Sequence, residues 1–312
     1  MASFAPMTLL EQLSLLTTES VNPVTADIDR ANARQIAELL HAQDMLVAQA
    51  VGTQLASITE AIEAVADALG HGGRLIYVGA GTSGRLGILD ASEMPPTYGT
   101  PPEMVQGIIA GGYDAVFRSV EGAEDSAEEG ARALEDANVG PADVVCGITA
   151  SGRTPFVLGA LSCARRRASR TILVSTNPRD VVAELCPEAG ILICPVVGPE
   201  PIAGSTRMKS GTAQKMVLNM ITTGAMVRLG KTYGNVMVDV QLTNEKLRQR
   251  ALRTIMSICG VDPTRAAELL SASNGHVKTA LVMHAGDCSR EEAEIRLDSA
   301  NGIVRIAMEN TV

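Results

Sequence analysis

The sequence predicts an α/β protein built on a doubly wound, five-stranded parallel sheet with helices on both faces. Five short apolar runs, each followed by small or polar residues, recur between residues 74 and 197. Stretches with the spacing of helices separate most of these runs. Buried strands that alternate with helices are typical of parallel sheets covered on both sides.

Each predicted strand is a short apolar run that ends where small or polar residues begin. Bounded runs of this length are typical of buried strands in parallel sheets. A long helix from about residue 208 to 229 is expected after the fifth run. The sheet domain is therefore expected to span residues 65–235. The five runs are Arg74–Val78, Met104–Ile109, Asp143–Ile148, Thr171–Ser175 and Ile191–Val197.

Helical segments are expected on both sides of the sheet domain. Apolar residues recur at helical spacing between Ile36 and Val47, so residues 1–64 are expected to form an N-terminal helical segment. Residues 240–312 carry turn signals at 260–264 and 273–275, and Ser289 and Glu292 have the spacing of a capping box. We expect a small unit of three short helices there.

Composition and charge exclude several classes of function. Hydrophobic residues make up 46% and charged residues 20%, which fits a packed globular protein. With no Trp, four Tyr and three Phe, stacking on aromatic platforms is not expected to be the main binding mode. The formal net charge is −9, and residues 1–70 hold nine acidic and two basic residues. We therefore expect no nucleic-acid partner.

Cysteine spacing and the N-terminal sequence bear on the compartment. The six Cys form no C-x-x-C pair and the four His are scattered, so we expect reduced thiols and no metal site. No basic residue precedes Arg30, which argues against a secretory signal. The longest apolar helical stretch, 216–227, is too short to span a bilayer. A cytoplasmic protein without a membrane partner is expected.

The turn after the first predicted strand has the composition of a phosphate-binding loop. It reads Gly-Ala-Gly-Thr-Ser-Gly-Arg-Leu-Gly over residues 79–87, so Thr82 and Ser83 can donate hydrogen bonds beside a helix N-terminus. No Gly-Lys-Ser/Thr follows, which excludes a Walker loop, and no acidic residue ends the second strand as a dinucleotide fold requires. The alternative is a tight turn made of small residues.

Two further polar turns are expected at the same end of the sheet. The third strand is followed by Ser151, Arg153 and Thr154, with Pro155 suited to a first helical turn. Because carboxyl ends of parallel strands share one edge, this turn and residues 79–87 would form one phosphate cradle. The third turn opens the long helix with Ser205, Arg207 and Lys209. It is either an ordinary cap with solvated cations or a site for a ligand's carboxylate or hydroxyl groups.

Two glutamates are candidates for paired acid and base chemistry. Pro95 and Pro96 are expected to stop the helix that begins at the first turn, which places Glu93 at a helix C-terminus, where the dipole favours the protonated form. Glu124 is expected in the first turn of the helix after the second strand, where the dipole favours the ionised form. Such a pair suits general acid–base catalysis, although acidic residues are also common in first helical turns.

Segments along nearly the whole chain resemble one family, the N-acetylmuramic acid 6-phosphate etherases. The similarity includes residues near Asn22 as well as the segment 244–246. That family has a sugar isomerase (SIS) domain and is related to the glucokinase regulatory protein. The five matching segments are Gly79–Tyr98, Val120–Asp125, Ala150–Pro155, Gly204–Lys209 and Asn235–Asp239.

The resemblance implies an activity, a substrate and roles for particular residues. Family members cleave the D-lactyl ether of N-acetylmuramic acid 6-phosphate, giving N-acetylglucosamine 6-phosphate and D-lactate in the recycling of cell-wall sugars. Glu93 and Glu124 fall on the family's two active-site glutamates, and Glu121 is expected to contact the substrate. Lys278 either reaches the ligand from the C-terminal helices or is a solvated lysine.

The resemblance also implies that no cofactor is needed, that the protein is a homodimer, and that the C-terminal helices have a ubiquitin-associated (UBA-like) fold. Two other functions fit the same fold. One is a sugar-phosphate sensor without catalysis, although the glucokinase regulatory protein has two sheet domains and this chain has room for one. The other is an aldose–ketose isomerase, which also begins by removing a proton next to a carbonyl. A transcription regulator is argued against by the acidic N-terminal region.

Overall fold

The computed structural model describes residues 16–239, 242 and 245–309, and the chain forms two compact units. The first unit holds the described residues up to Ala91 together with Glu103–Thr222, and the second holds Ser92–Pro102 with the residues from Thr223 onward. The predicted segments 1–64, 65–235 and 240–312 have other boundaries, and that division stays a prediction. Asn244, in one of the family-like segments, lies outside the described residues.

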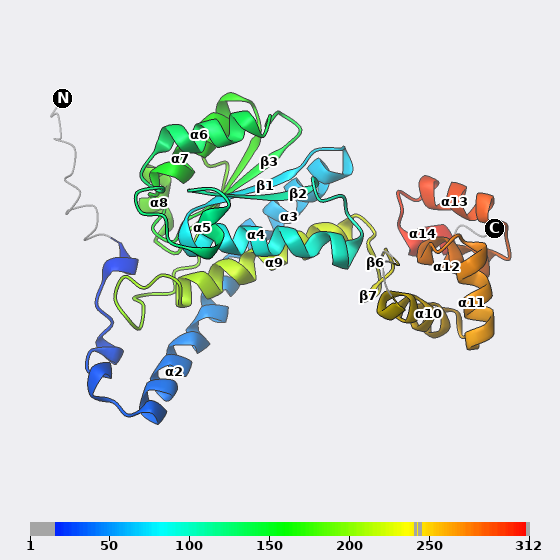
Figure 1. The fold of residues 1–312 in the computed structure, drawn as a ribbon, viewed down its shortest axis with the longest axis horizontal. Helices are drawn as coiled ribbons and strands as arrows, with labels where there is room; N and C mark the ends of the chain where they lie inside the picture. The colour runs from blue at the N-terminus through cyan, green and yellow to red at the C-terminus, as the bar shows by residue number, and fades with distance from the viewer. Residues whose placement is uncertain (1–15, 240–241, 243–244, 310–312) are drawn as a thin grey trace. The chain divides into compact units, whose positions relative to one another are not determined.

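The first unit contains the predicted five-stranded parallel sheet, with strand order β2-β1-β3-β4-β5 (Figure 1). Each strand begins within one residue of its predicted start, because each is a buried run bounded by turn residues. The fifth strand is shorter than its apolar run, which continues to Val197 as irregular chain. The strands are β1 Leu75–Gly79, β2 Val105–Ile109, β3 Val144–Ile148, β4 Arg170–Val174 and β5 Ile191–Ile193.

The carboxyl ends of the strands are level with one another. Gly79 at the end of β1 is paired with Ile109 of β2 and with Ile148 of β3. Ile148 is in turn paired with Val174 at the end of β4. The turns that follow β1, β2, β3 and β4 therefore start at the same edge of the sheet.

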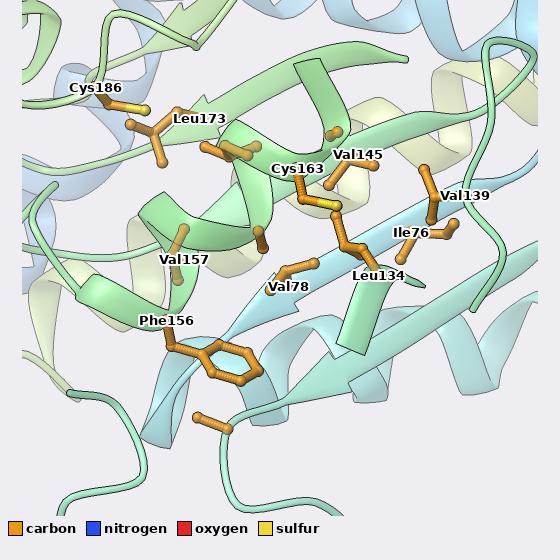
Figure 2. Packing of buried hydrophobic residues seen from close by; sticks show 14 of the residues in the cluster. Ile76, Val78, Leu134, Val139, Val145, Phe156, Val157, Cys163, Leu173 and Cys186 are labelled. Carbon is orange, nitrogen blue, oxygen red and sulfur yellow. The ribbon is translucent and has the colours of Figure 1, made fainter. Parts of the chain in front are cut away.

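One face of the sheet is covered by α6 (Ala127–Asp136), α7 (Pro155–Arg166) and α8 (Arg179–Leu185). Figure 2 shows Leu134 of α6 and Val157 of α7 packed beside Ile76, Val78 and Val145 of the strands. Within this cluster the side chains are aliphatic, apart from Phe156 and the buried cysteines. In this protein with few aromatic residues, the core on this face is therefore filled mainly by aliphatic side chains.

The opposite face of the sheet is covered by α3 (Leu55–Gly70), α4 (Gly81–Tyr98) and α9 (Lys209–Arg228) (Figure 1). Asp90 of α4 is buried there and accepts hydrogen bonds from the Tyr77 hydroxyl at 2.9 Å and the Asn219 amide at 2.7 Å. Burial raises the pKa of Asp90, and these hydrogen bonds offset part of the shift. The polar cluster joins β1, α4 and α9.

The N-terminal segment is helical from residue 16 onward, as predicted, and the first fifteen residues of that prediction lie outside the described residues. Three short 3-10 helices, Thr17–Glu19, Pro23–Thr25 and Ile28–Arg30, precede α2 (Ala33–Gly52), whose N-terminus has a capping box of Asn32 and Gln35. The segment is tied to the sheet through polar contacts. The Asn22 amide donates to the Pro199 carbonyl oxygen at 3.1 Å, and the Thr17 backbone N–H donates to Asn177, after β4, at 2.8 Å.

The second unit contains a hairpin, β6 (Thr232–Tyr233) and β7 (Val236–Met237), and five helices within residues 245–309. The prediction of three helices was therefore wrong: the long polar run after residue 244 forms a full helix of its own, and a further short helix follows residue 303. The UBA-like fold stays a prediction. The five helices are α10 Glu245–Cys259, α11 Pro263–Ala272, α12 Val277–Gly286, α13 Arg290–Ser299 and α14 Val304–Glu309.

The predicted capping box of Ser289 and Glu292 is present at the start of α13. Asp262 caps α11 by accepting from the Arg265 N–H, and Pro263 occupies its first turn. Across the described ranges, none of the helices has both the length and the apolar character needed to cross a membrane.

Candidate functional site

The turn after β1 leads directly into α4, whose first turn carries Thr82 and Ser83. Gly84 is packed against the backbone of Gly79, since an added Cβ would lie 2.8 Å from the Gly79 carbonyl oxygen. This close approach brings the helix N-terminus against the strand end. First-turn N–H groups have no acceptor inside their own helix and favour an anion. The Ser83 hydroxyl donates to Oε1 of Gln214 in α9 at 2.9 Å.

The turn after β3 is organised around Thr149. Its hydroxyl lies 2.8 Å from that of Thr154 and 3.2 Å from that of Ser151. The Ser151 oxygen also accepts from the Arg153 backbone N–H at 3.3 Å. Pro155 occupies the first turn of α7, as predicted. Three hydroxyl groups thus gather at the N-terminus of a helix, in an arrangement suited to phosphate oxygens.

The start of α9 lies beside these turns. The Thr176 hydroxyl, after β4, donates to the Ser210 hydroxyl at 3.0 Å, and its backbone N–H donates to the Ala150 carbonyl at 3.1 Å. The buried carboxylate of Glu200 accepts from the backbone N–H groups of Lys209 and Ser210, both at 2.9 Å. Glu200 therefore caps α9 from the loop that precedes the helix.

Glu124 lies in a turn before α6, so its predicted place in the first helical turn was wrong. Ser126 caps α6 by accepting from the Glu129 N–H, and Gly122 has a φ of +72°, which a helix cannot continue through. Glu121 and Glu124 are both exposed and line a cavity of about 140 Å³. The cavity also reaches Gly81, after β1, and Arg85 of α4.

The loop that carries Glu124 is held at both ends. The Arg85 guanidinium donates to the carbonyl oxygens of Val116 at 2.9 Å and Arg118 at 3.2 Å. At the other end, the Phe156 backbone N–H donates to the carbonyl oxygen of Glu124 at 3.0 Å. The backbone of Glu124 is therefore fixed at the N-terminus of α7, and Glu124 lines the same cavity as Gly81 and Arg85.

Glu93 lies inside α4 and not at its end, so its predicted place at a helix C-terminus was also wrong. The helix continues through Pro95 and Pro96 to Tyr98. A proline removes an N–H donor without forcing a stop so near the end, and the helix ends instead at Gly99, whose φ is +65°. The Glu93 side chain is exposed and belongs to the second compact unit.

The third predicted turn divides into two kinds of residue. Arg207 is exposed and Ser205 is half-buried before α9. Lys209 is only 1% exposed, and its ammonium donates to Gln43 of α2 at 3.0 Å. Burial lowers the pKa of Lys209, although nearby Glu200 and Asp44 act in the opposite direction. Its contacts are those of a residue that joins α9 to the N-terminal segment.

Lys278 is part of an ion cluster in the second unit. Its ammonium lies 3.0 Å from Oδ2 of Asp239, and Lys231 lies 2.6 Å from the same oxygen. Burial lowers the pKa of Lys278, and Asp239 acts against that shift. Lys278 also lines a cavity of about 460 Å³ with His276 and Asn274. Lys278 is thus not a solvated lysine.

Sequence reasoning missed Arg85 and Gln214. Arg85 stands within the recognised Gly-rich segment, but no local pattern shows that it holds a loop thirty residues on. Gln214 is four residues after Ser210 and so on the same face of α9, a spacing from which its position at the site follows. Among the residues that the structure describes, no three His, Cys, Asp or Glu side chains gather as a metal site would require.

Hydroxyl-rich turns at helix N-termini and an adjacent carboxylate cavity, at the carboxyl edge of a doubly wound sheet, suit binding of a phosphorylated ligand. The fold is that of a sugar isomerase (SIS) domain. Residues 57–165 match the family model described as "Glucokinase regulatory protein N-terminal SIS domain".

Comparison with curated proteins places the chain more narrowly. It is 56% identical to the N-acetylmuramic acid 6-phosphate etherase of Salinibacter ruber, over 96% of each chain. It is 53% identical to the protein of that name from Rhodopirellula baltica, over 94% of this chain and 96% of the relative, and 49% identical to that from Vibrio vulnificus, over 95% and 98%. This chain belongs to the N-acetylmuramic acid 6-phosphate etherase family.

Among solved structures, phosphoheptose isomerase from Neisseria gonorrhoeae aligns with 61% of this chain and 99% of its own, at 15% identity and a TM-score of 0.45.

Proposed function

We propose that this chain is a lyase that cleaves the D-lactyl ether of N-acetylmuramic acid 6-phosphate. The products are N-acetylglucosamine 6-phosphate and D-lactate, so the reaction serves the recycling of cell-wall amino sugars. The observation that carries the proposal is the Glu124 cavity, which lies beside hydroxyl-rich turns within a chain of this family. In this proposal the hydroxyl-rich turns bind the phosphate, and the adjacent cavity supplies the carboxylate of Glu124.

The reaction is an elimination followed by an addition. In the open-chain sugar the C1 aldehyde acidifies the C2 proton, and a general base removes it. The C3–O bond then breaks, with the electron pair leaving on the lactate oxygen, which a general acid protonates. Water adds to C3 of the unsaturated aldehyde, and C2 takes a proton back. The atoms of one water are consumed overall, and no electron is exchanged with a cofactor.

Glu124 is assigned as the base that removes the C2 proton. It is exposed in the cavity, and its backbone is fixed by α7 and, through the preceding loop, by Arg85. An open, anchored carboxylate can reach a substrate atom. Glu93 is assigned as the acid, and then as the group that activates water, because its exposed side chain stands in the family-like segment 79–98. Neither glutamate lies at the helix end that was predicted for it.

Phosphate binding is assigned to Thr82, Ser83, Ser151 and Thr154, which lie at the N-termini of α4 and α7. Arg153 and Arg207 are the cations assigned to the ligand. Glu121 and Ser205 remain candidates for its hydroxyl groups. Lys209 and Lys278 are kept as weaker candidates, because both ammonium groups are engaged within the protein.

Two further expectations belong to the proposal. A cytoplasmic location fits the six cysteines, all of them free thiols. A homodimer is expected from the family resemblance, and sedimentation of the purified protein tests it. A sedimenting species of monomer mass would contradict that part of the proposal.

The test is turnover without additives. The purified protein is incubated with N-acetylmuramic acid 6-phosphate, without added metal or nucleotide, and D-lactate is followed with a coupled enzyme. Release by the wild type and by Glu135→Gln, an exposed glutamate of α6, but not by Glu124→Gln, supports the proposal. Binding without release would favour a sensor, and a product that keeps its lactyl group would favour an isomerase.

A further inference from the structure

The Ser83 hydroxyl cannot serve a phosphate in the arrangement that the structure shows. Its single proton is donated to Oε1 of Gln214 at 2.9 Å. Because a carbonyl oxygen can only accept, this bond uses the one Ser83 proton. Only the lone pairs of the Ser83 oxygen remain for other groups. An ionised phosphate also offers only acceptors and would be repelled. For Ser83 to bind phosphate, its proton must be released from Gln214.

Rotation of the Gln214 amide would release the Ser83 proton. Gln214 is 1% exposed, and its Nε2 is buried without a hydrogen-bond partner among the residues that the structure describes. A buried amide NH₂ without an acceptor is costly. The oxygen and nitrogen of an amide have nearly the same size, so a half-turn of the amide fits the same space. After that turn, Nε2 donates to the Ser83 oxygen.

Gln214 is also placed where a ligand at the first turn would affect it. It lies in α9, and the preceding turn of α9 packs on the phosphate loop: an added Cβ at Gly211 would lie 3.4 Å from the Thr82 methyl group. On the other side of that turn, Ser210 accepts from Thr176 after β4. The first turns of α9 therefore pack against the two turns assigned to phosphate binding. The Gln214 amide contacts the Ser83 hydroxyl of one of these turns.

We propose that Gln214 is a positioning residue for Ser83, whose amide turns when an anion binds. In the free protein Ser83 donates to Oε1. With phosphate bound, Nε2 donates to the Ser83 oxygen and the Ser83 proton is donated to a phosphate oxygen. No bond is made or broken, and each hydroxyl and amide hydrogen stays on its own atom. The inference rests on the proposed function only in taking Ser83 as part of the phosphate cradle.

The test compares Gln214→Glu with the wild type. A glutamate has the same shape, but its carboxylate accepts only, so it keeps the Ser83 proton. The dissociation constant of N-acetylglucosamine 6-phosphate, measured by calorimetry, is expected to rise about 10- to 100-fold, as for loss of a hydrogen bond to a charged group. In a turnover assay, KM is expected to rise by a similar factor while kcat changes less than about threefold.

A double-mutant cycle separates action through Ser83 from action of the new charge itself. Gln214→Glu raises the dissociation constant by some factor in each background. In the Ser83→Ala background that factor is expected to be at least about fivefold smaller than in the wild-type background. Gln214→Met, which cannot donate and has only a weakly accepting thioether sulfur, is the second variant if Gln214→Glu does not fold. Its effect on binding is also expected to disappear once Ser83 is Ala.

Equal effects of the Gln214 substitutions with and without the Ser83 hydroxyl would overturn the inference, as would a Ser83→Ala variant that binds like the wild type. Because binding is measured on the product, the result does not depend on turnover. A wild type that binds N-acetylglucosamine 6-phosphate but releases no D-lactate from the substrate would contradict the proposed function. It would not contradict this inference.

Discussion

The carbonyl oxygen of Glu124 and the backbone N–H of Phe156 are joined by a hydrogen bond of 3.0 Å. Phe156 is the second residue of α7, one turn from the hydroxyl groups of Ser151 and Thr154. The bond satisfies a first-turn N–H of α7 and fixes the backbone of Glu124 at the same time. The residue assigned to catalysis is thereby joined by its backbone to the helix that follows the turn assigned to phosphate.

The approach of α6 to α7 decides whether this contact can form. A Cβ at Gly130 of α6 would lie 1.9 Å from the Phe156 carbonyl oxygen. Gly130→Ala must therefore push the helices apart, which is expected to cost about 1–3 kcal/mol and to lower kcat by displacing Glu124. Thermal unfolding and turnover measure the two effects.

The control is Gly52→Ala at the end of α2, where an added Cβ meets nothing within 4 Å. It is expected to change stability by less than about 0.5 kcal/mol. A Gly130→Ala variant as stable as Gly52→Ala would show that the two helices are not packed this closely.

Replacing Ser151 tests the cradle on the α7 side. Ser151→Ala removes the hydroxyl that lies 3.2 Å from Thr149, and a phosphate would lose a charge-assisted hydrogen bond of about 1.5–3 kcal/mol. KM for N-acetylmuramic acid 6-phosphate is expected to rise accordingly, with little change in kcat. Ser162→Ala, later in α7, removes a hydroxyl that bonds only Arg166 in the described contacts and should leave KM unchanged. An unchanged KM in Ser151→Ala removes that residue from the cradle.

The pair of Asp143 and Arg74 predicts a pH dependence of stability. Burial alone would raise the pKa of Asp143, but hydrogen bonds from the Arg74 side chain at 2.7 Å and 3.1 Å and from the Gly140 N–H at 2.9 Å lower it overall. The unfolded chain has the ordinary value of 3.8. Since the pKa of Asp143 is lower in the folded protein, its ionised carboxylate stabilises the fold fully at pH values above the unfolded value of 3.8. This contribution is lost as the pH falls through the folded pKa.

Asp143→Asn is therefore expected to lower the free energy of unfolding by about 1.5–3 kcal/mol at pH 7. Urea unfolding between pH 7 and pH 3 should show the difference from the wild type shrinking at the acid end. Asp27→Asn, which breaks an exposed pair with Arg30 at 3.6 Å, should change little at any pH. A difference that stays constant down to pH 3 would contradict the lowered pKa.

The sheet and its polar turns could be predicted because their signals are local. A buried strand is a short apolar run, and the residues that follow it must stand at the sheet's edge, as Ser83 and Ser151 do. The turn after β4 is an exception. Asn177 follows the fourth predicted strand, and nothing local shows that its side chain bonds the Ala150 carbonyl at 3.0 Å and holds the N-terminal segment through Thr17.

The positions of the two glutamates could not be predicted from local rules. Two adjacent prolines suggested a helix end at Glu93, yet the helix reaches Tyr98 and is ended by Gly99. Glu124 was expected inside a helix whose start depends on the Ser126 cap. The spacing from Ser210 places Gln214 on the site-facing side of α9, but Gln214 and Ser83 are 131 positions apart and neither segment shows that their side chains meet.

The most direct test of the account is a reaction of N-acetylmuramic acid 6-phosphate in deuterated buffer, with D-lactate release and deuterium at C2 of the sugar measured together. The wild type is expected to release D-lactate and to leave one deuterium at C2 of N-acetylglucosamine 6-phosphate. Glu124→Ala should do neither, whereas Glu93→Ala should exchange C2 without releasing D-lactate. Loss of exchange in Glu93→Ala would make the assigned roles wrong or shared, and a wild type that binds the sugar but releases no D-lactate would contradict the central claim.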